Sequence, residues 1–276
     1  MAGLQALRKR LRSIRSTEQL AAAMRTAATA KYSRVNKVRA EYAPYADACR
    51  DMLSLLGDAG IVRHTETVCD RRAYILLSSN RGLCGGFHAE LFRYFADILS
   101  KDTAVPVLLT GGRKAASHLR DKHLDSETFS VSDIPTFAEA RALSERVRTL
   151  YESGEVSEVY IVYQRYRNML IQTPAVQRLL PGSGETGRED DSLLYLPDRG
   201  TISARLAISC LDAQIYSLLL ENASGAQAAT LMAMRAACDN AAETAAKLEI
   251  TINRQRQAQV TASVIETASG NLHQGE

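Results

Sequence analysis

Two long stretches with a helical pattern enclose a shorter region in which the pattern changes. The run from Ser203 to Ala268 holds seventeen alanines, no proline and the single glycine Gly225. Alanine is the best helix former and proline the worst, so this run predicts one helix on the order of 100 Å long. A helix of that length needs a partner surface for its apolar side.

The first part of the chain offers such a partner. A helical pattern extends from Leu4 to about Leu56, with an apolar stripe at spacings of three and four. Ser16 or Thr17 could cap a second helix, but we prefer one continuous helix, and Pro44 should kink or end its straight part. Small residues in both runs favour an antiparallel coiled coil, although neither stripe keeps a strict heptad for long.

Between Asp70 and Pro197 short apolar runs alternate with amphipathic segments. Strands are predicted at residues 73–79, 105–109, 128–131 and 158–164, with a weaker one at 175–180. Helices are predicted at residues 88–100, 113–123 and 136–153. This alternation indicates a mainly parallel sheet, whereas the Gly-rich, charged segment Gly182–Asp191 is interpreted as a mobile loop.

The predicted fold class is therefore α/β with long terminal helices. An antiparallel coiled coil of the N- and C-terminal helices carries an inserted Rossmann-like α/β domain. The expected boundaries are residues 1–58 for the N-terminal coiled-coil helix, 70–198 for the α/β domain and 203–268 for the C-terminal coiled-coil helix.

Charge is distributed unevenly along the chain. The net charge of the whole chain is +3, but residues 1–50 hold eleven Lys or Arg against three acids, which is about +8. A basic arm of this kind suggests an acidic partner, such as nucleic acid, anionic lipid or an acidic protein surface, and the alternative is a solvated helix face. A nucleic-acid-binding coiled-coil protein is thus one functional hypothesis, although no recognised reading module supports it.

The cysteines and the apolar runs restrict the class of protein. Five widely spaced cysteines without a Cys/His cluster argue against a disulfide framework or a zinc site and favour a reducing compartment. No apolar run approaches the roughly 20 residues that cross a bilayer, and the N-terminus lacks a signal-peptide pattern. We therefore expect a soluble, cytosolic protein that could still attach to a membrane complex.

Candidate chemistry is confined to one loop. Asn80–Phe87 follows a predicted strand and precedes a helix, but its glycines fit neither dinucleotide-binding nor P-loop spacing, so a structural turn is favoured. Cys84 in this loop is either an activated nucleophile or, as we expect, a buried inert thiol. No catalytic residue, cofactor site or metal site is predicted. The polar cluster from Asn253 to Gln259 either grips a partner or is a solvated face.

Three motifs in order resemble the gamma subunit of the rotary, F-type ATP synthase. Leu7–Lys31 (LRKRLRSIRSTEQLAAAMRTAATAK) is similar to the family's N-terminal motif, Ser78–Phe87 (SSNRGLCGGF) to its S-D-R-G-L-C-G-x-[FY], and Asn253–Ile265 (NRQRQAQVTASVI) to its N-[RK]-x-R-Q-A-x-I-T-x-E-[LI]. Asn80 replaces the family's usual Asp. Gly225 and Thr230 stand where the family often has Glu and Arg.

The resemblance implies a central rotor shaft that turns inside a hexamer of alpha and beta subunits. It couples ion flow through a membrane c-ring to ATP synthesis or hydrolysis at the beta-subunit sites. The implied partners are the alpha and beta subunits, the epsilon subunit and the c-ring, without nucleic acid, and the subunit itself has no catalytic residue. The implied location is the cytoplasmic face of the cell membrane, as a peripheral protein.

The resemblance also assigns residues by position. It implies that Met24, Arg25, Arg256, Gln257 and Thr261 contact the hexamer. It places Tyr195, Leu196 and Asp198 in a foot that meets the membrane ring, where Leu196 replaces the usual Glu.

Overall fold

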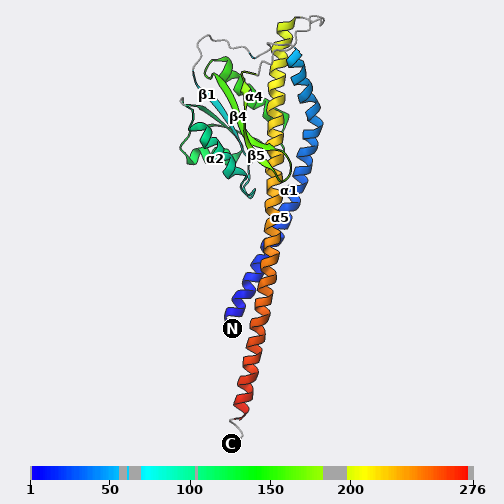
Figure 1. Ribbon diagram of the computed structural model, residues 1–276, viewed down its shortest axis with the longest axis vertical. Coiled ribbons are helices and arrows are strands. Elements are labelled where there is room, and N and C mark those ends of the chain that lie inside the picture. Colours follow the sequence, from blue (N-terminus) through cyan, green and yellow to red (C-terminus); the bar gives the residue numbers. More distant parts are fainter. Residues whose placement is uncertain (1, 56–60, 62–69, 103–104, 183–197, 273–276) are drawn as a thin grey trace. The chain divides into compact units, whose positions relative to one another are not determined.

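The computed structural model describes residues 2–55, 61, 70–102, 105–182 and 198–272, and these form two compact units (Figure 1). The first unit contains helix α1 (Ala2–Leu55) up to Ala27 and helix α5 (Arg199–Leu272) from Ala233. The second unit contains the chain from Ala28 to Met232. Both terminal helices therefore contribute to both units.

Helix α1 is continuous, as preferred from the sequence, and it does not end at Pro44. The Thr17 hydroxyl donates to the Ser13 carbonyl oxygen one turn earlier (3.0 Å), so it starts no new helix. Pro44 is exposed, whereas Ala46 and Cys49 lie buried against Ala213 of α5. We infer that this packing on the other side of α1 offsets the hydrogen bond that proline cannot donate.

Helix α5 begins at Arg199, four residues before the predicted start. Asp198 caps it: its carboxylate accepts from the Thr201 backbone N–H (2.8 Å) and from the Thr201 hydroxyl (2.7 Å). The predicted loop Gly182–Asp191 lies, apart from Gly182, outside the described residues.

The second unit contains a five-stranded sheet in the order β3-β2-β1-β4-β5. Its strands are β1 (Arg72–Leu77), β2 (Val107–Gly111), β3 (Glu127–Phe129), β4 (Glu158–Tyr166) and β5 (Gln172–Leu180). The strands β1 to β4 run parallel, which confirms the prediction, and β5 pairs antiparallel with β4. Strand β5 begins three residues before its predicted start, because hairpin pairing with β4 includes polar residues such as Gln172.

Helices cover both faces of this sheet. Helices α2 (Phe87–Leu99) and α3 (Arg113–Asp121) pack on the face that carries Tyr74, Leu76 and Val162. Helix α4 (Phe137–Glu152) and parts of α5 and α1 pack on the face that carries Ile75, Ile161 and Tyr163. A parallel sheet is buried on both faces, so α1 and α5 together with α4 form one of its two covering layers.

An ion cluster joins α1 to the loops at the end of the sheet. The Lys31 ammonium of α1 pairs with Asp133, and the Arg81 guanidinium lies 3.9 Å from the same carboxylate oxygen. Burial opposes ionisation of Asp133, but the Lys31 and Arg81 charges together outweigh it and hold the pKa of Asp133 below its usual value. Lys31 ends the N-terminal motif, so this motif also anchors the α/β domain.

The turn between β2 and α3 requires a glycine. Gly112 has φ of +96°, and a Cβ atom built on it would lie 2.5 Å from the Ser78 carbonyl oxygen. Ser78 is held in place, because its hydroxyl accepts from the Ala115 backbone N–H (2.7 Å). The β1 and β2 chain ends thus approach too closely for any side chain at position 112.

We predict that Gly112→Ala lowers the free energy of unfolding by about 2–4 kcal/mol, through backbone strain and overlap with Ser78. Denaturant unfolding followed by circular dichroism measures this. The matched control is Gly82→Ala, where the nearest atom to a new Cβ is Lys114 Cε at 3.7 Å. Equal destabilisation of the two variants would contradict the assignment.

We predict that Asp133→Asn lowers the free energy of unfolding at pH 7 by about 1–3 kcal/mol, since it leaves a partly buried Lys31 charge unpaired. The folded-state pKa of Asp133 is depressed, so its stabilisation is present above the unfolded pKa of about 3.9 and is lost as pH falls through the folded pKa. The difference between wild type and variant should therefore shrink in acid. Unfolding curves from pH 7 to pH 3 test this, and a difference independent of pH would refute it.

Candidate functional site

The loop from Ser78 to Phe87 is a junction between elements of the second unit. Asn80 donates from its side-chain amide to the Val131 carbonyl oxygen and accepts from the Arg113 backbone N–H (3.1 Å). Ser79 donates to the Arg81 carbonyl oxygen (2.7 Å). The loop therefore fixes the start of α3 and the segment after β3, which is the structural turn expected from the sequence.

Buried polar side chains connect this loop to α5. The Gln164 amide of β4 donates to the Phe87 carbonyl oxygen (2.8 Å), and Asn222 of α5 accepts from the Gln164 backbone N–H (3.3 Å). Both side chains are buried, so each unmade bond would carry a desolvation cost. Neither residue can be recognised as a connector from the sequence, because the partners of Gln164 lie 58 and 77 positions away in the chain.

The packing around Gly225 leaves little space for the larger residue that the family often has at this position. A Cβ atom at this position would lie 3.2 Å from Phe87 Cε2 and 3.4 Å from Gln172 Cγ. The glutamate usual in the family would need these neighbours to move. In this chain α5 instead approaches the loop closely, with Ala226 buried against Cys84 and Phe87.

The loop does not offer an activated thiol. Cys84 is 3% exposed, and burial, the largest effect, raises the pKa of its thiol. His88 bonds through Nε2 to the Ser79 hydroxyl (3.0 Å), and burial lowers the pKa of its imidazole. The half-buried histidine and the buried, protonated thiol are structural groups, as expected for Cys84. Within the described residues, no group of three or more His, Cys, Asp or Glu is arranged to hold a metal ion.

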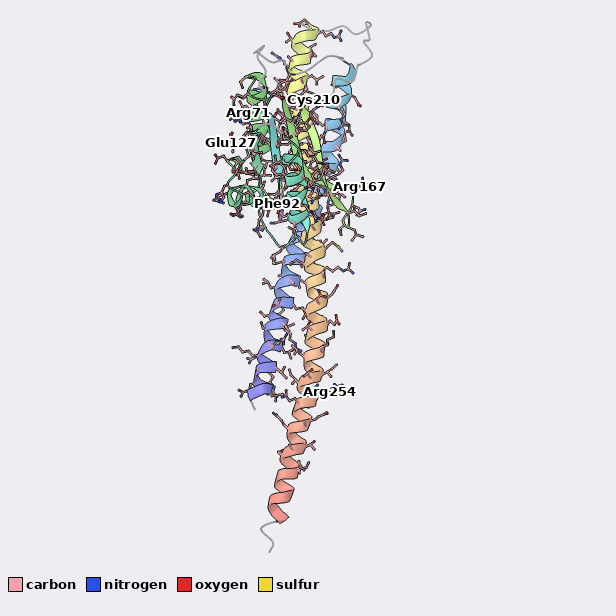
Figure 2. The ribbon with its side chains drawn as sticks, turned by 60° about the vertical axis from the view of Figure 1, so that its left-hand side comes forward. Arg71, Phe92, Glu127, Arg167, Cys210 and Arg254 are labelled. Atoms are coloured by element: carbon pink, nitrogen blue, oxygen red, sulfur yellow. The ribbon has the colours of Figure 1, made fainter. Side chains whose placement is uncertain are left out.

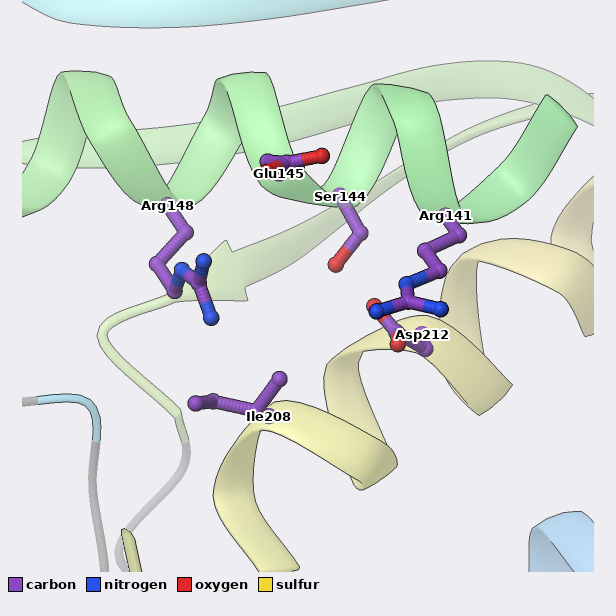
Figure 3. Close-up of a pocket in the computed structure, with 6 residues that line it drawn as sticks. All are labelled: Arg141, Ser144, Glu145, Arg148, Ile208 and Asp212. Atoms are coloured by element: carbon purple, nitrogen blue, oxygen red, sulfur yellow. The ribbon is translucent and has the colours of Figure 1, made fainter. Parts of the chain in front are cut away.

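A small cavity lies between α4 and α5 of the second unit (Figure 3). Its volume is about 70 Å³, and Arg141 and Arg148 approach it from α4 while Asp212 faces it from α5. Such a volume accommodates a few water molecules, and the charges around it are mixed. It therefore does not suit an organic cofactor.

In the first unit, α1 and α5 pair through seams that alternate spacings of three and four. The α1 seam is half-buried or buried at Leu4, Leu7, Leu11, Ile14, Glu18 and Ala21, and the α5 seam at Met234, Cys238, Ala241, Ala245, Leu248, Ile252, Gln255 and Gln259. The buried positions therefore keep a heptad spacing in this unit, although the apolar stripes, as predicted, do not keep a strict heptad for long. Polar Glu18, Gln255 and Gln259 interrupt the apolar pattern but still occupy seam positions.

The register of this pair is antiparallel, as predicted. Ala21 is buried against Met234 and Cys238. Gly3 lies against Gln255, since a Cβ atom placed on Gly3 would be 3.3 Å from the Gln255 side-chain amide nitrogen. An exposed ion pair between Arg15 and Glu249 adds little, because solvent screens it. Alanine and cysteine at the seam let the two backbones approach closely.

The predicted contact residues fall into two groups along this pair. Met24 is half-buried against the seam cluster of Ala21, Met234 and Cys238, so only part of it is available to a partner, whereas Arg25 is exposed. Arg256, Gln257 and Thr261 are all exposed on α5. The register separates the two groups by roughly 30 Å along α5, so they do not form one site.

The last described turns of α5 carry an apolar surface that sequence analysis did not list among the contacts. Val260 is 57% exposed, and Val264 and Ile265 are each 61% exposed. Gly3, near the start of α1, already lies opposite Gln255, while α5 continues to Leu272. Gln257 and Thr261 lie on the side of α5 away from the seam residue Ile252, as does Arg254 in Figure 2.

The predicted foot is only partly within the described structure. Tyr195 and Leu196 lie outside the described residues, and Asp198 caps α5 through Thr201. The hydrogen bond from the Thr201 backbone N–H, the larger effect, and the one from the Thr201 hydroxyl lower the pKa of Asp198. Among the described helices, none combines the length and apolar character required to span a membrane.

Comparison with known proteins gives matches over nearly the full length of the chain. A family model described as ATP synthase matches residues 3–271. The ATP synthase gamma chain of Glaesserella parasuis serovar 5 (strain SH0165) is 31% identical over 287 residues, covering 98% of this chain and 99% of the relative. That of Desulfitobacterium hafniense (strain DSM 10664 / DCB-2) is 30% identical over 276 residues, covering 98% of each.

Solved structures share the fold. A chain of the Euglena gracilis mitochondrial ATP synthase (OSCP/F1/c-ring) has a TM-score of 0.72 at 18% identity and covers 98% of this chain and 94% of its own. A chain of the rotor of the same synthase has a TM-score of 0.68 at 17% identity, covering 94% and 99%. At these identities the likeness shows the fold alone. The family model and the relatives that are 30% or more identical over nearly the whole chain show the family. The chain therefore belongs to the ATP synthase gamma chain family.

Proposed function

We propose that this chain is the central rotor shaft of an F-type ATP synthase. It couples ion flow through the membrane c-ring to ATP synthesis or hydrolysis at the beta-subunit catalytic sites. Its partners are the alpha and beta subunits, the epsilon subunit and the c-ring. It sits as a peripheral subunit on the cytoplasmic face of the cell membrane, and it contributes no catalytic residue of its own.

The observation that carries this proposal is the exposed apolar surface at the end of α5. Val260 and Val264 are exposed on a helix that continues beyond Gln255, the residue that lies against Gly3. An apolar surface of this kind is stabilised by a partner that surrounds it. A sleeve formed by alpha and beta subunits supplies such a partner, with Arg256, Gln257 and Thr261 as its polar contacts.

The basic arm supports the same partners. Arg8, Arg12 and Arg15 are exposed in the first turns of α1, on the same unit as the apolar end of α5. Acidic loops of the beta subunits would complement this charge, and Met24 and Arg25 would meet the same loops. Because the charges are exposed, salt should weaken this attraction.

A rotor also needs a firm connection between its helices and its α/β domain. In the second unit that connection consists of the Lys31–Asp133 pair and the buried Gln164 and Asn222 side chains. Such groups resist relative movement, since each becomes costly when its partner is withdrawn. We propose that the segment before α5, with Tyr195, Leu196 and Asp198, forms the foot on the membrane ring. The residues 1–58, 70–198 and 203–268 remain our proposed functional division.

We predict that the tagged chain, isolated from mildly solubilised membranes of its own organism, carries alpha and beta subunits and ATPase activity. Deleting Arg256–Glu276 should lower that activity severalfold, because it removes the apolar end of α5 from the sleeve. Mass spectrometry and an ATPase assay measure this. Recovery of nucleic acid without alpha or beta subunits would overturn the proposal and favour the nucleic-acid-binding alternative, which further predicts a steep salt dependence.

We predict that Gln257→Ala combined with Thr261→Ala lowers the ATPase activity of the isolated complex by roughly fivefold, if one hydrogen bond of about 1 kcal/mol is lost at the limiting step. The matched control is Thr244→Ala, because the exposed Thr244 hydroxyl donates to the Asn240 carbonyl oxygen of its own helix (2.8 Å). Equal activity of the double variant and the control would refute the role assigned to Gln257 and Thr261.

A further inference from the structure

Two cysteines that are far apart in the chain meet where α1 and α5 pair in the second unit. Cys210 of α5 (Figure 2) donates its thiol to the Cys49 carbonyl oxygen of α1, with 2.9 Å between sulfur and oxygen. The two residues are separated by 161 positions in sequence. The contact therefore depends on the fold and not on local spacing.

The surroundings of this pair favour close approach. Cys49 and Cys210 belong to one cluster with Ala46 and Ala213, whose small side chains let the two helices come together. Cys49 is 6% exposed, and Cys210 is half-buried at the margin of the cluster. A small oxidant can thus reach the pair from the Cys210 side.

The remaining described cysteines lack this arrangement. Cys238 packs in the seam of the first unit with Ala21 and Met234, and Cys84 packs with Phe87 and Ala226. Neither of these clusters, as far as the structure describes them, contains a second cysteine. The chain therefore provides internal controls of similar burial.

We propose that Cys49 and Cys210 form a reversible oxidation site, at which a peroxide converts the two thiols into a disulfide that links α1 to α5. An antiparallel register places positions 49 and 210 opposite each other, just as it does Ala46 and Ala213. A disulfide requires Cα atoms about 4.4–6.8 Å apart, and small neighbours at a helix pair allow this separation. This inference does not depend on the proposed rotor function.

The chemistry balances with one peroxide. A thiolate of the pair attacks a peroxide oxygen, the O–O bond breaks, and a sulfenic acid forms as the first water leaves. The second sulfur attacks the sulfenic sulfur, the S–O bond breaks, and a second water leaves as the disulfide forms. The two thiols are oxidised by two electrons, which reduce the peroxide to two waters. A dithiol reductant reverses the step by thiol exchange.

The environment of the pair sets the rate. Burial, the largest effect, together with the nearby Cys49 raises the pKa of the Cys210 thiol to about 12. Tyr45, Arg50 and Asp212 also lie near this cluster. A hydrogen bond to Cys49 is the largest of the effects that raise the pKa of Tyr45. Thiolate is scarce at neutral pH, so we expect oxidation to be slow at pH 7 and to accelerate as pH rises.

The experiment treats the full chain with hydrogen peroxide, blocks the remaining thiols by alkylation and digests it with trypsin. The sequence places each cysteine in its own tryptic peptide: residues 40–50 for Cys49, 64–71 for Cys69, 82–93 for Cys84, 206–235 for Cys210 and 236–247 for Cys238. We expect peptides 40–50 and 206–235 to be joined, with the loss of two hydrogen atoms, and to separate after dithiothreitol. Pairing of Cys49 with Cys69 instead, or only singly oxidised cysteines, would overturn the proposal.

Variants test the same site by stability. Oxidised wild type should unfold at a higher temperature than reduced wild type, because a link across a long loop restricts the unfolded chain. Cys49→Ser and Cys210→Ser should each abolish this gain, and the control Cys238→Ser should retain it. Peptide mapping uses the wild type alone, so it tests the disulfide even if Cys49→Ser or Cys210→Ser folds poorly. An equal gain in all variants would refute the assignment.

Discussion

The close antiparallel approach of α1 and α5 is the constraint on which the rest of the structure depends. In the first unit it rests on Ala21, Ala241 and Ala245, and in the second on Ala46 and Ala213. Small seam residues bring two backbones together over many turns, and dispersion contacts then accumulate along the whole pair. The same pair, with α4, covers one face of the parallel sheet, so the α/β domain would lose part of its core without it.

Buried polar side chains fix the orientation of the loop after β1 relative to its neighbouring elements. The apolar layers around Ile75 and Ile161 hold the domain together, but apolar contact is not directional. Ser78, Gln164 and Asn222 supply the direction, since their hydrogen bonds fix the loop after β1 against α5. Loss of one partner would leave a buried polar atom unpaired, which is why such groups define one arrangement.

The sequence motifs carried more structural than chemical information. The loop from Ser78 to Phe87 resembles a recognisable family segment, and the structure uses it to connect β1, α2, α3 and α5 rather than to hold a ligand. Lys31, the last residue of the N-terminal motif, pairs with Asp133 in the α/β domain. Conversely, Arg256, Gln257 and Thr261 near the end of α5 are exposed together with Val260 and Val264, which suits contact with another subunit.

The sequence by itself determined the two terminal helices, the mainly parallel sheet and the family, because alanine content, periodicity and motif order are local properties of the chain. It misplaced element ends such as the start of β5, where pairing with β4 decides. It did not reveal the heptad spacing of the buried seam positions, because the polar residues Glu18 and Gln255 interrupt the apolar pattern there. Only the tertiary structure decided that Lys31 meets Asp133, that Phe87 leaves little space at Gly225 and that Cys49 meets Cys210. These contacts join residues from about 100 to 160 positions apart, and their partners are set by packing, which no local pattern encodes.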